Sequence, residues 1–219
     1  MTTFVPSLCR AARCFCAGAD LSLVGSVIAE GKIDDFLSRW HNVFARIEGC
    51  SKPTIAAIHG MALAGGFELM QVCDLAVMGD ASRVGDQHAK FGLFPGGGST
   101  QRLPRLIGRR AATWMLLNGD SIEPGQALAL GLVNDVVAED AVAERAREIG
   151  ETLAERSMVA SRAIKEVLKR TRDVDLAKGI DIEREIAAAH MASPDVARGL
   201  YAFKSRTAPD FGYLQPANG

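Results

Sequence analysis

The sequence has 219 residues, of which 48% are hydrophobic and 23% are charged, and its net charge at pH 7 is −1. This length and composition are those of a globular protein that can bury a substantial core. The balanced charge offers no field that would gather nucleic acid or an anionic membrane. No apolar run is long enough to cross a bilayer, and the N-terminus lacks the apolar segment of a signal peptide, so we expect a cytoplasmic protein.

The five cysteines, Cys9, Cys14, Cys16, Cys50 and Cys73, are odd in number and contain no C-x-x-C pair. Their spacing therefore suggests neither a metal site nor a redox site. We expect reduced thiols, as in a cytosolic protein, and no bound metal.

The first predicted element is an amphipathic helix over 33–49, where apolar residues recur at spacings of three and four. A short buried strand follows over 53–60. The stretch MALAGGFELMQVCD (61–74) predicts a helix, and DLAVMG (74–79) predicts a second strand. A strand, a helix and a strand at this spacing predict a βαβ crossover and therefore a parallel sheet.

The second half of the chain is mainly helical by its sequence. RLIGRRAATWMLLNG (105–119) predicts one helix, 132–137 predicts a last strand, and the pattern is almost continuously helical from Asp140 onward. We therefore expect a core over 1–138, built of strands and helices, followed by a helical region over 139–219.

Three single residues carry structural expectations. Asp74 is the last residue of the stretch 61–74, after Cys73, and is expected to hold a turn or cap the backbone. Trp40 and Trp114 stand at the spacing of helical core residues, so we expect both to pack in the core rather than stack on a ligand.

Two glycines stand at an unfavourable place in the helix predicted over 61–74. Gly65 and Gly66 occupy its first turn, where each costs about 0.5–1 kcal/mol relative to alanine, and Glu68 follows. Unpaired N–H groups at a helix start suit a carbonyl oxygen that becomes negative during a reaction, and Glu68 could act beside it as acid or base. A Gly-Gly pair is more often a tight turn or a packing contact, so both interpretations stay open.

Five segments in a fixed order carry a more specific pattern: FCAGADL (15–21), KPTIAAIHGMALAGGFELMQVCDLAV (52–77), FGLFPGGGSTQRLPRLIG (91–108), GDSIEPGQALALGLVNDVV (119–137) and GLYAFKSRTAPDF (199–211). Together they resemble the enoyl-CoA hydratase/isomerase (crotonase) superfamily over most of the chain. The resemblance implies an α/β fold, a ClpP-like spiral of ββα units followed by helices for oligomerisation, assembled as homotrimers or hexamers. It also implies an enzyme of fatty acid metabolism, a lyase or an isomerase, that acts on acyl-CoA thioesters. No separate cofactor is implied, because CoA is part of the substrate.

The resemblance also implies roles for single residues. The backbone N–H groups of Ala19 and Gly65 match an oxyanion hole that holds the thioester oxygen as it becomes an enolate. The residues that match positions contacting the substrate or its CoA are Ala17, Gly18, Asp20, Leu21, Gly96, Phe203 and Lys204. For Lys204, a lysine that only meets solvent is an equal alternative.

The second acid/base group departs from the pattern of typical hydratases, which place two glutamates on opposite sides of a water molecule. Glu68 matches the first. The second belongs to a G-Q-P-E stretch that here reads GDQH (85–88), which puts His88 at the glutamate position and leaves Asp86 as the fallback. A histidine exchanges protons readily near pH 7, but a solvated loop histidine without a chemical role is the alternative. Hydration, double-bond isomerisation, and hydrolysis or dehalogenation of another acyl-CoA all stay open.

The start of the chain departs from the family as well. Relatives carry strands and a helix that contribute to the CoA pocket before the AGAD turn, whereas residues 1–14 read MTTFVPSLCRAARC. We therefore expect a shortened or misassigned start, or a divergent paralogue that is inactive and only binds acyl-CoA or assembles with relatives. Missing strands would expose a sheet edge, so that stability would depend on oligomer contacts.

Overall fold

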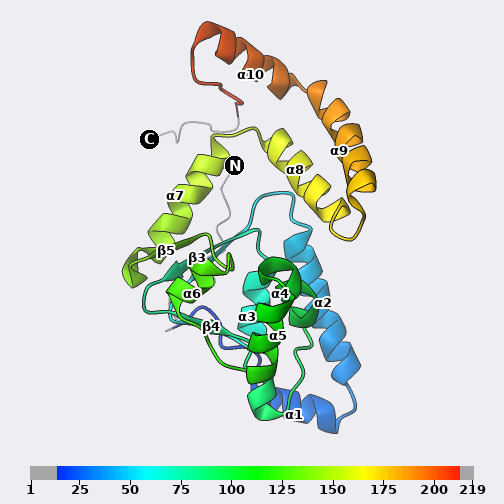
Figure 1. Ribbon diagram of the computed structural model, residues 1–219, viewed down its shortest axis with the longest axis vertical. Coiled ribbons are helices and arrows are strands. Elements are labelled where there is room, and N and C mark those ends of the chain that lie inside the picture. The colour runs from blue at the N-terminus through cyan, green and yellow to red at the C-terminus, as the bar shows by residue number, and fades with distance from the viewer. Residues whose placement is uncertain (1–13, 213–219) are drawn as a thin grey trace. The chain divides into compact units, whose positions relative to one another are not determined.

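The computed structural model describes residues 14–212, which form two compact units (Figure 1). The core unit comprises residues 14–50 and 54–147, and the C-terminal unit comprises 51–53 and 148–212. The expectations for the start of the chain and for Cys9 lie outside the described residues. The other four cysteines are free thiols.

The strands of the core unit form two small parallel sheets. β1 (Ile55–Ile58), β3 (Leu75–Gly79) and β5 (Asp135–Val137) form one sheet in the order β1-β3-β5, and β2 (Met61–Leu63) pairs with β4 (Arg83–Gly85) in the other. The chain therefore adds β1 to one sheet and β2 to the other, continues through a helix, and returns to the first sheet with β3. This alternation is the predicted spiral of ββα units.

Helices precede and connect these strands along the chain. Those of the core unit are α1 (Leu21–Ala29), α2 (Ile33–Glu48), α3 (Gly65–Gln71), α4 (Ser99–Ile107), α5 (Arg109–Asn118) and α6 (Pro124–Ala129), with a short 3-10 turn η1 (His88–Phe91). α3 joins β2 to β3 and packs against α4. Its Phe67 and Met70 are buried in the hydrophobic core with Ile58, Met78 and Leu103.

Some of the predicted elements are confirmed, and others are wrong or were missed. The predicted helix over 33–49 and the strands within 53–60 and 74–79 match α2, β1 and β3. The predicted single helix over 105–119 is wrong, because Gly108 adopts a φ of 80° and separates α4 from α5. The helix predicted over 61–74 is confirmed only for Gly65–Gln71, because Met61–Leu63 form β2. α1, β2 and β4 were not predicted. The two strands have three residues each, too few to show an alternating pattern.

The expectations for single residues have different outcomes. Asp74 accepts hydrogen bonds from the backbone N–H of Thr54 at 2.7 Å and from its hydroxyl at 2.8 Å, which confirms its role at the turn. Trp114 is 69% exposed on α5, so the prediction that it packs in the core is wrong. Its spacing fitted an apolar helix face, but spacing does not say whether that face is covered within the chain.

The C-terminal unit is helical. It contains the end of α7 (Val142–Ala154), which begins in the core unit, together with α8 (Met158–Arg170), α9 (Leu176–Met191) and α10 (Pro194–Ser205). α8 and α9 lie side by side (Figure 1). Across residues 14–212, no helix combines the length and the apolar character needed to span a bilayer. The predicted division of the chain at residues 138 and 139 stays a prediction.

Candidate active site

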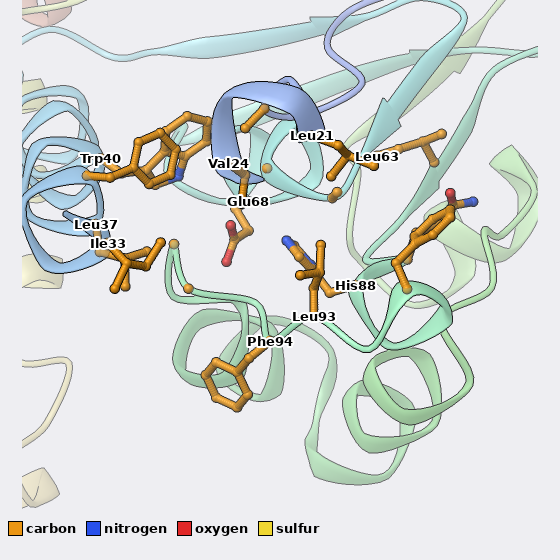
Figure 2. Close-up of a pocket in the computed structure, with 18 of the residues that line it drawn as sticks. Leu21, Val24, Ile33, Leu37, Trp40, Leu63, Glu68, His88, Leu93 and Phe94 are labelled. Carbon is orange, nitrogen blue, oxygen red and sulfur yellow. The ribbon is translucent and has the colours of Figure 1, made fainter. Parts of the chain in front are cut away.

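A pocket of about 360 Å³ opens in the core unit between α1, α2, the start of α3 and the segment that follows β4 (Figure 2). Its polar side chains are Glu68, Gln87 and His88, and it also contains the indole of Trp40. The rest of the wall is mainly apolar and comprises Leu21, Val24, Ile28, Ile33, Phe36, Leu37, Leu63, Phe91, Leu93 and Phe94. The pocket is therefore a mainly apolar cleft with few polar groups, as is usual for small-molecule sites.

Most of the predicted site residues meet at this pocket. Those that line it are Ala17, Ala19, Leu21, Gly65, Glu68, His88 and Gly96. Gly18 lies beside them, because a Cβ atom built on it would lie 3.1 Å from the backbone nitrogen of Gly65.

The remaining predicted residues lie elsewhere or have another visible role. The Asp20 carboxylate caps α1, accepting from Ser22 N at 2.7 Å and from Leu23 N at 3.4 Å. Phe203 and Lys204 are exposed on α10 of the C-terminal unit. The predicted contacts of these three residues with CoA stay predictions.

Two backbone amides of the pocket are unpaired. α3 begins at Gly65, directly after Ala64, whose φ is 49°, so the Gly65 N–H has no acceptor within the helix. Ala19 immediately precedes Asp20, the N-cap of α1. Within residues 14–212, neither the Ala19 nor the Gly65 N–H donates a hydrogen bond. Both are therefore free to donate to a ligand in the pocket.

The adjacent glycines at the start of α3 are required for different reasons. A Cβ on Gly66 would lie 1.9 Å from the carbonyl oxygen of Cys16, so this position admits only glycine while the two backbones stay in contact. A Cβ on Gly65 would lie 2.7 Å from the Trp40 ring. For Gly66 the packing interpretation is confirmed. Its close contact also brings the Ala17–Ala19 backbone beside the start of α3.

Glu68 lies in the first turn of α3 and is almost fully buried, with 2% of its surface exposed. Its Oε1 accepts a hydrogen bond from the Ser99 N–H, at the start of α4, at 3.2 Å. Burial raises the pKa of Glu68 above the usual 4.5 and outweighs the hydrogen bond from Ser99 and the nearby His88, both of which lower it. The folded protein thus binds this proton more tightly than the unfolded chain, so Glu68 lowers stability as the pH rises above 4.5.

His88 faces Glu68 across the pocket, and Figure 2 shows the two side chains pointing toward one another. The His88 side chain is only 12% exposed, so it is not a solvated loop residue. Its Nδ1 lies 2.7 Å from Oδ1 of Asp86, which is buried and does not line the pocket. Burial lowers the pKa of His88, but the hydrogen bond and charge of Asp86, with the charge of Glu68, raise it by more.

The Pro-Gly turn after β4, formed by Pro95, Gly96 and Gly97, passes close to Glu68. A Cβ on Gly97 would lie 2.4 Å from Glu68 Oε2 and 2.6 Å from Trp40 Nε1, and one on Gly96 would lie 2.7 Å from Leu37. Trp40 Nε1 is buried and, among the described residues, has no hydrogen-bond partner. The Gly97 backbone therefore lies directly beside Glu68 Oε2 and Trp40 Nε1. Any side chain at position 97 would push these two atoms out of place.

Sequence reasoning missed the helical wall of the pocket. Ile33, Phe36, Leu37 and Trp40 lie on one apolar stripe of α2, and this stripe was visible as a period of three and four. The period alone could not show that the stripe borders a cavity. Residues 14–212 contain no cluster of three or more His, Cys, Asp or Glu side chains arranged to hold a metal.

Comparison with known proteins places these features in context. The model of the family described as enoyl-CoA hydratase/isomerase matches residues 8–213. The chain is 36% identical over 200 residues to 2,3-dehydroadipyl-CoA hydratase of Escherichia coli K12, covering 91% of this chain and 77% of the relative. It is 36% identical over 201 residues to human mitochondrial enoyl-CoA hydratase domain-containing protein 2, covering 90% and 68%.

Solved structures agree with the sequence relatives. The crystal structure of an enoyl-CoA hydratase from Bacillus anthracis superposes with a TM-score of 0.85 at 33% identity, covering 91% of this chain and 77% of that one. The predicted crotonase fold is confirmed by this similarity.

We expect Gly97→Ala to damage the site, because its methyl group would fall within 3.0 Å of both Glu68 Oε2 and Trp40 Nε1. The free energy of unfolding should fall by about 1–3 kcal/mol, as for other overpacked positions. Turnover of an enoyl-CoA should fall about a hundredfold, the cost of misplacing a catalytic group by about 1 Å. Chemical denaturation and a steady-state assay measure the two effects.

Gly125→Ala is the matched control, because a Cβ on Gly125, within α6, meets no atom within 4 Å. This variant should keep both stability and turnover. Equal behaviour of the two variants would contradict the proposed contact between Gly97 and Glu68.

Proposed function

The chain belongs to the enoyl-CoA hydratase/isomerase family, and we propose that it is an enoyl-CoA hydratase that adds water across the double bond next to a thioester. The observation that carries the proposal is the meeting, in one apolar pocket, of two unpaired backbone amides with two facing proton-exchanging side chains. The named hydratases among its relatives support the same reaction.

We propose that the amides of Ala19 and Gly65 hold the thioester oxygen. Attack of water at the β-carbon moves electrons onto this oxygen, so the transition state resembles an enolate. Two N–H donors fixed by backbone geometry stabilise that charge without having to reorganise, and the dipole of α3 adds a partial positive charge at Gly65. Each such donor typically contributes about 2.7–4 kcal/mol of transition-state stabilisation.

Glu68 and His88 then handle the protons. The Glu68 carboxylate takes a proton from water as the hydroxyl adds to the β-carbon, and protonated His88 gives a proton to the α-carbon. Transfer of the proton from Glu68 to His88 restores the starting state, and the product has gained one hydroxyl and one hydrogen. Such acid–base assistance typically accelerates a reaction by about 10²–10⁴.

The facing pair favours hydration over simple isomerisation. A double-bond shift needs one base that moves a proton between two carbons, which Glu68 alone could supply. Hydration needs a base for water and an acid for the α-carbon at the same time. His88 stands opposite Glu68, where a hydratase requires its second group, although it is not a glutamate.

The exposed apolar side chains of the C-terminal unit support a further part of the proposal, that this protein works as a homotrimer or hexamer. Leu176, Tyr201 and Phe203 are among the most exposed large apolar residues of this unit, and Phe203 is 83% exposed. Large exposed apolar surface of this kind marks interaction sites.

The proposal is tested by turnover of a short enoyl-CoA by the wild-type chain and by Glu68→Gln. We expect Glu68→Gln to lower kcat at least about a hundredfold, because an amide cannot accept the proton of water. The control is Glu144→Gln, at an exposed glutamate paired with Arg147, which should keep full activity. Full activity of Glu68→Gln would contradict its role, and calorimetric binding of acyl-CoA without any turnover would instead support a non-catalytic protein.

The apolar wall predicts which acyl groups this pocket accepts. Among the described residues that line it there is no lysine or arginine, so a carboxylate at the far end of the acyl chain would be buried without a counter-charge. We expect kcat/KM for trans-2-hexenoyl-CoA to exceed that for 2,3-dehydroadipyl-CoA, which has the same number of carbons, by at least about a hundredfold. Similar values would show that a cation reaches the acyl end.

A further inference from the structure

Asp86 directly follows β4 and is buried behind His88, with 1% of its side chain exposed. One carboxylate oxygen, Oδ1, lies 2.7 Å from His88 Nδ1. The other, Oδ2, is buried and has no hydrogen-bond partner among residues 14–212. A buried carboxylate with an unpartnered oxygen lowers the stability of the fold, so packing alone does not explain an aspartate at this position.

The backbone between the two residues brings their side chains together. Gln87 adopts the left-handed conformation, with φ 54° and ψ −8°, which residues with a side chain rarely adopt. The His88 N–H donates to the Asp86 carbonyl oxygen at 2.7 Å, which closes a tight turn around Gln87. The contact between Asp86 and His88 therefore comes with two unfavourable features. These are the left-handed backbone of Gln87 and the unpartnered Oδ2 of Asp86.

We propose that Asp86 is a positioning residue that holds the Nδ1–H of His88, so that Nε2 is the atom that exchanges a proton with the substrate. The inference rests on the proposed function, in which His88 serves the α-carbon. A neutral imidazole carries one proton on one of its two nitrogens. A carboxylate at Nδ1 accepts that proton in a hydrogen bond, which leaves Nε2 as the acceptor facing the pocket.

The proton movement is then simple. Protonated His88 carries hydrogens on both nitrogens, and Asp86 stabilises its positive charge. When Nε2 gives its proton to the α-carbon, the N–H bond breaks, the C–H bond forms, and the ring is left neutral with its hydrogen on Nδ1. Asp86 stays ionised throughout and keeps the ring in the same orientation for the next cycle.

The charges around the His88 ring set the direction of its pH response. Asp86 on one side and Glu68 across the pocket both act on it. Lys90, on the same 3-10 turn, is paired with Asp120. Helix α5, which packs against this turn, carries Arg109 and Arg110 in a separate surface hollow. Because the carboxylate raises the pKa of His88, Asp86→Asn should lower it and move the corresponding limb of the pH–rate profile to lower pH.

The first test needs no turnover. ¹⁵N NMR of histidine-labelled protein reports which ring nitrogen carries the proton, and His88→Gln assigns the His88 signals. We expect neutral His88 to be protonated at Nδ1 in the wild type, and its titration midpoint to fall in Asp86→Asn. A wild-type ring protonated at Nε2, or an unchanged midpoint in Asp86→Asn, would overturn the proposal even if the protein proved inactive.

The second test separates positioning from a merely structural role. Asp86→Asn should lower kcat at least about tenfold, with KM within about twofold of the wild type. In the His88→Gln background the same change should have no further effect on kcat, because Asp86 acts only through His88. The control is Asp74→Asn, whose carboxylate holds Thr54 outside the pocket and should leave the pH profile in place. An equal loss of kcat with and without His88 would show that Asp86 only supports the fold.

Discussion

The contact between the backbone of Cys16 and the β2–α3 segment is the constraint on which the pocket depends. Cys16 N donates to Met61 O, and Leu63 N donates to Cys16 O, both at 3.0 Å, so the Cys16 segment runs parallel to β2. Gly66 then lies so close to the Cys16 carbonyl that no side chain fits. This pairing carries Ala19 and Gly65 to the same pocket. The hydrogen bonds of this pairing are made by Cys16, Met61 and Leu63, so the N–H groups of Ala19 and Gly65 stay unpaired.

The groups of the site lower the stability of the fold that holds them. Glu68 and Asp86 are buried acids, and an unpartnered oxygen of Asp86 and the indole N–H of Trp40 add further unsatisfied polarity. The large apolar side chains around them provide the opposing stabilisation, and they also exclude water. In the proposed mechanism, exclusion of water strengthens both the amide–oxygen interaction and the exchange of protons between facing groups. The same burial is therefore unfavourable for stability and favourable for the proposed chemistry.

Local patterns made much of the fold predictable, and contacts between distant residues account for the rest. α2, β1 and β3 each have a pattern within their own residues, and the order of five motifs indicated the family. The apolar stripe of α2 was visible in the sequence. It borders a pocket only because η1 and the Pro-Gly turn, some fifty residues further along the chain, form the opposite wall. The pairing of His88 with Asp86 depends on the left-handed Gln87, which no residue preference indicates. Trp114 fitted a buried face and is exposed, because spacing cannot report what covers a helix.

The proposed chemistry depends most directly on where a bound thioester places its oxygen. A crystal structure of the protein with a saturated acyl-CoA, which cannot be hydrated, measures this without relying on turnover. We expect the thioester oxygen within roughly 2.7–3.1 Å of both the Ala19 and the Gly65 nitrogen, with the α- and β-carbons between Glu68 and His88. A thioester oxygen bound elsewhere, or held by only one of the two amides, would contradict the account.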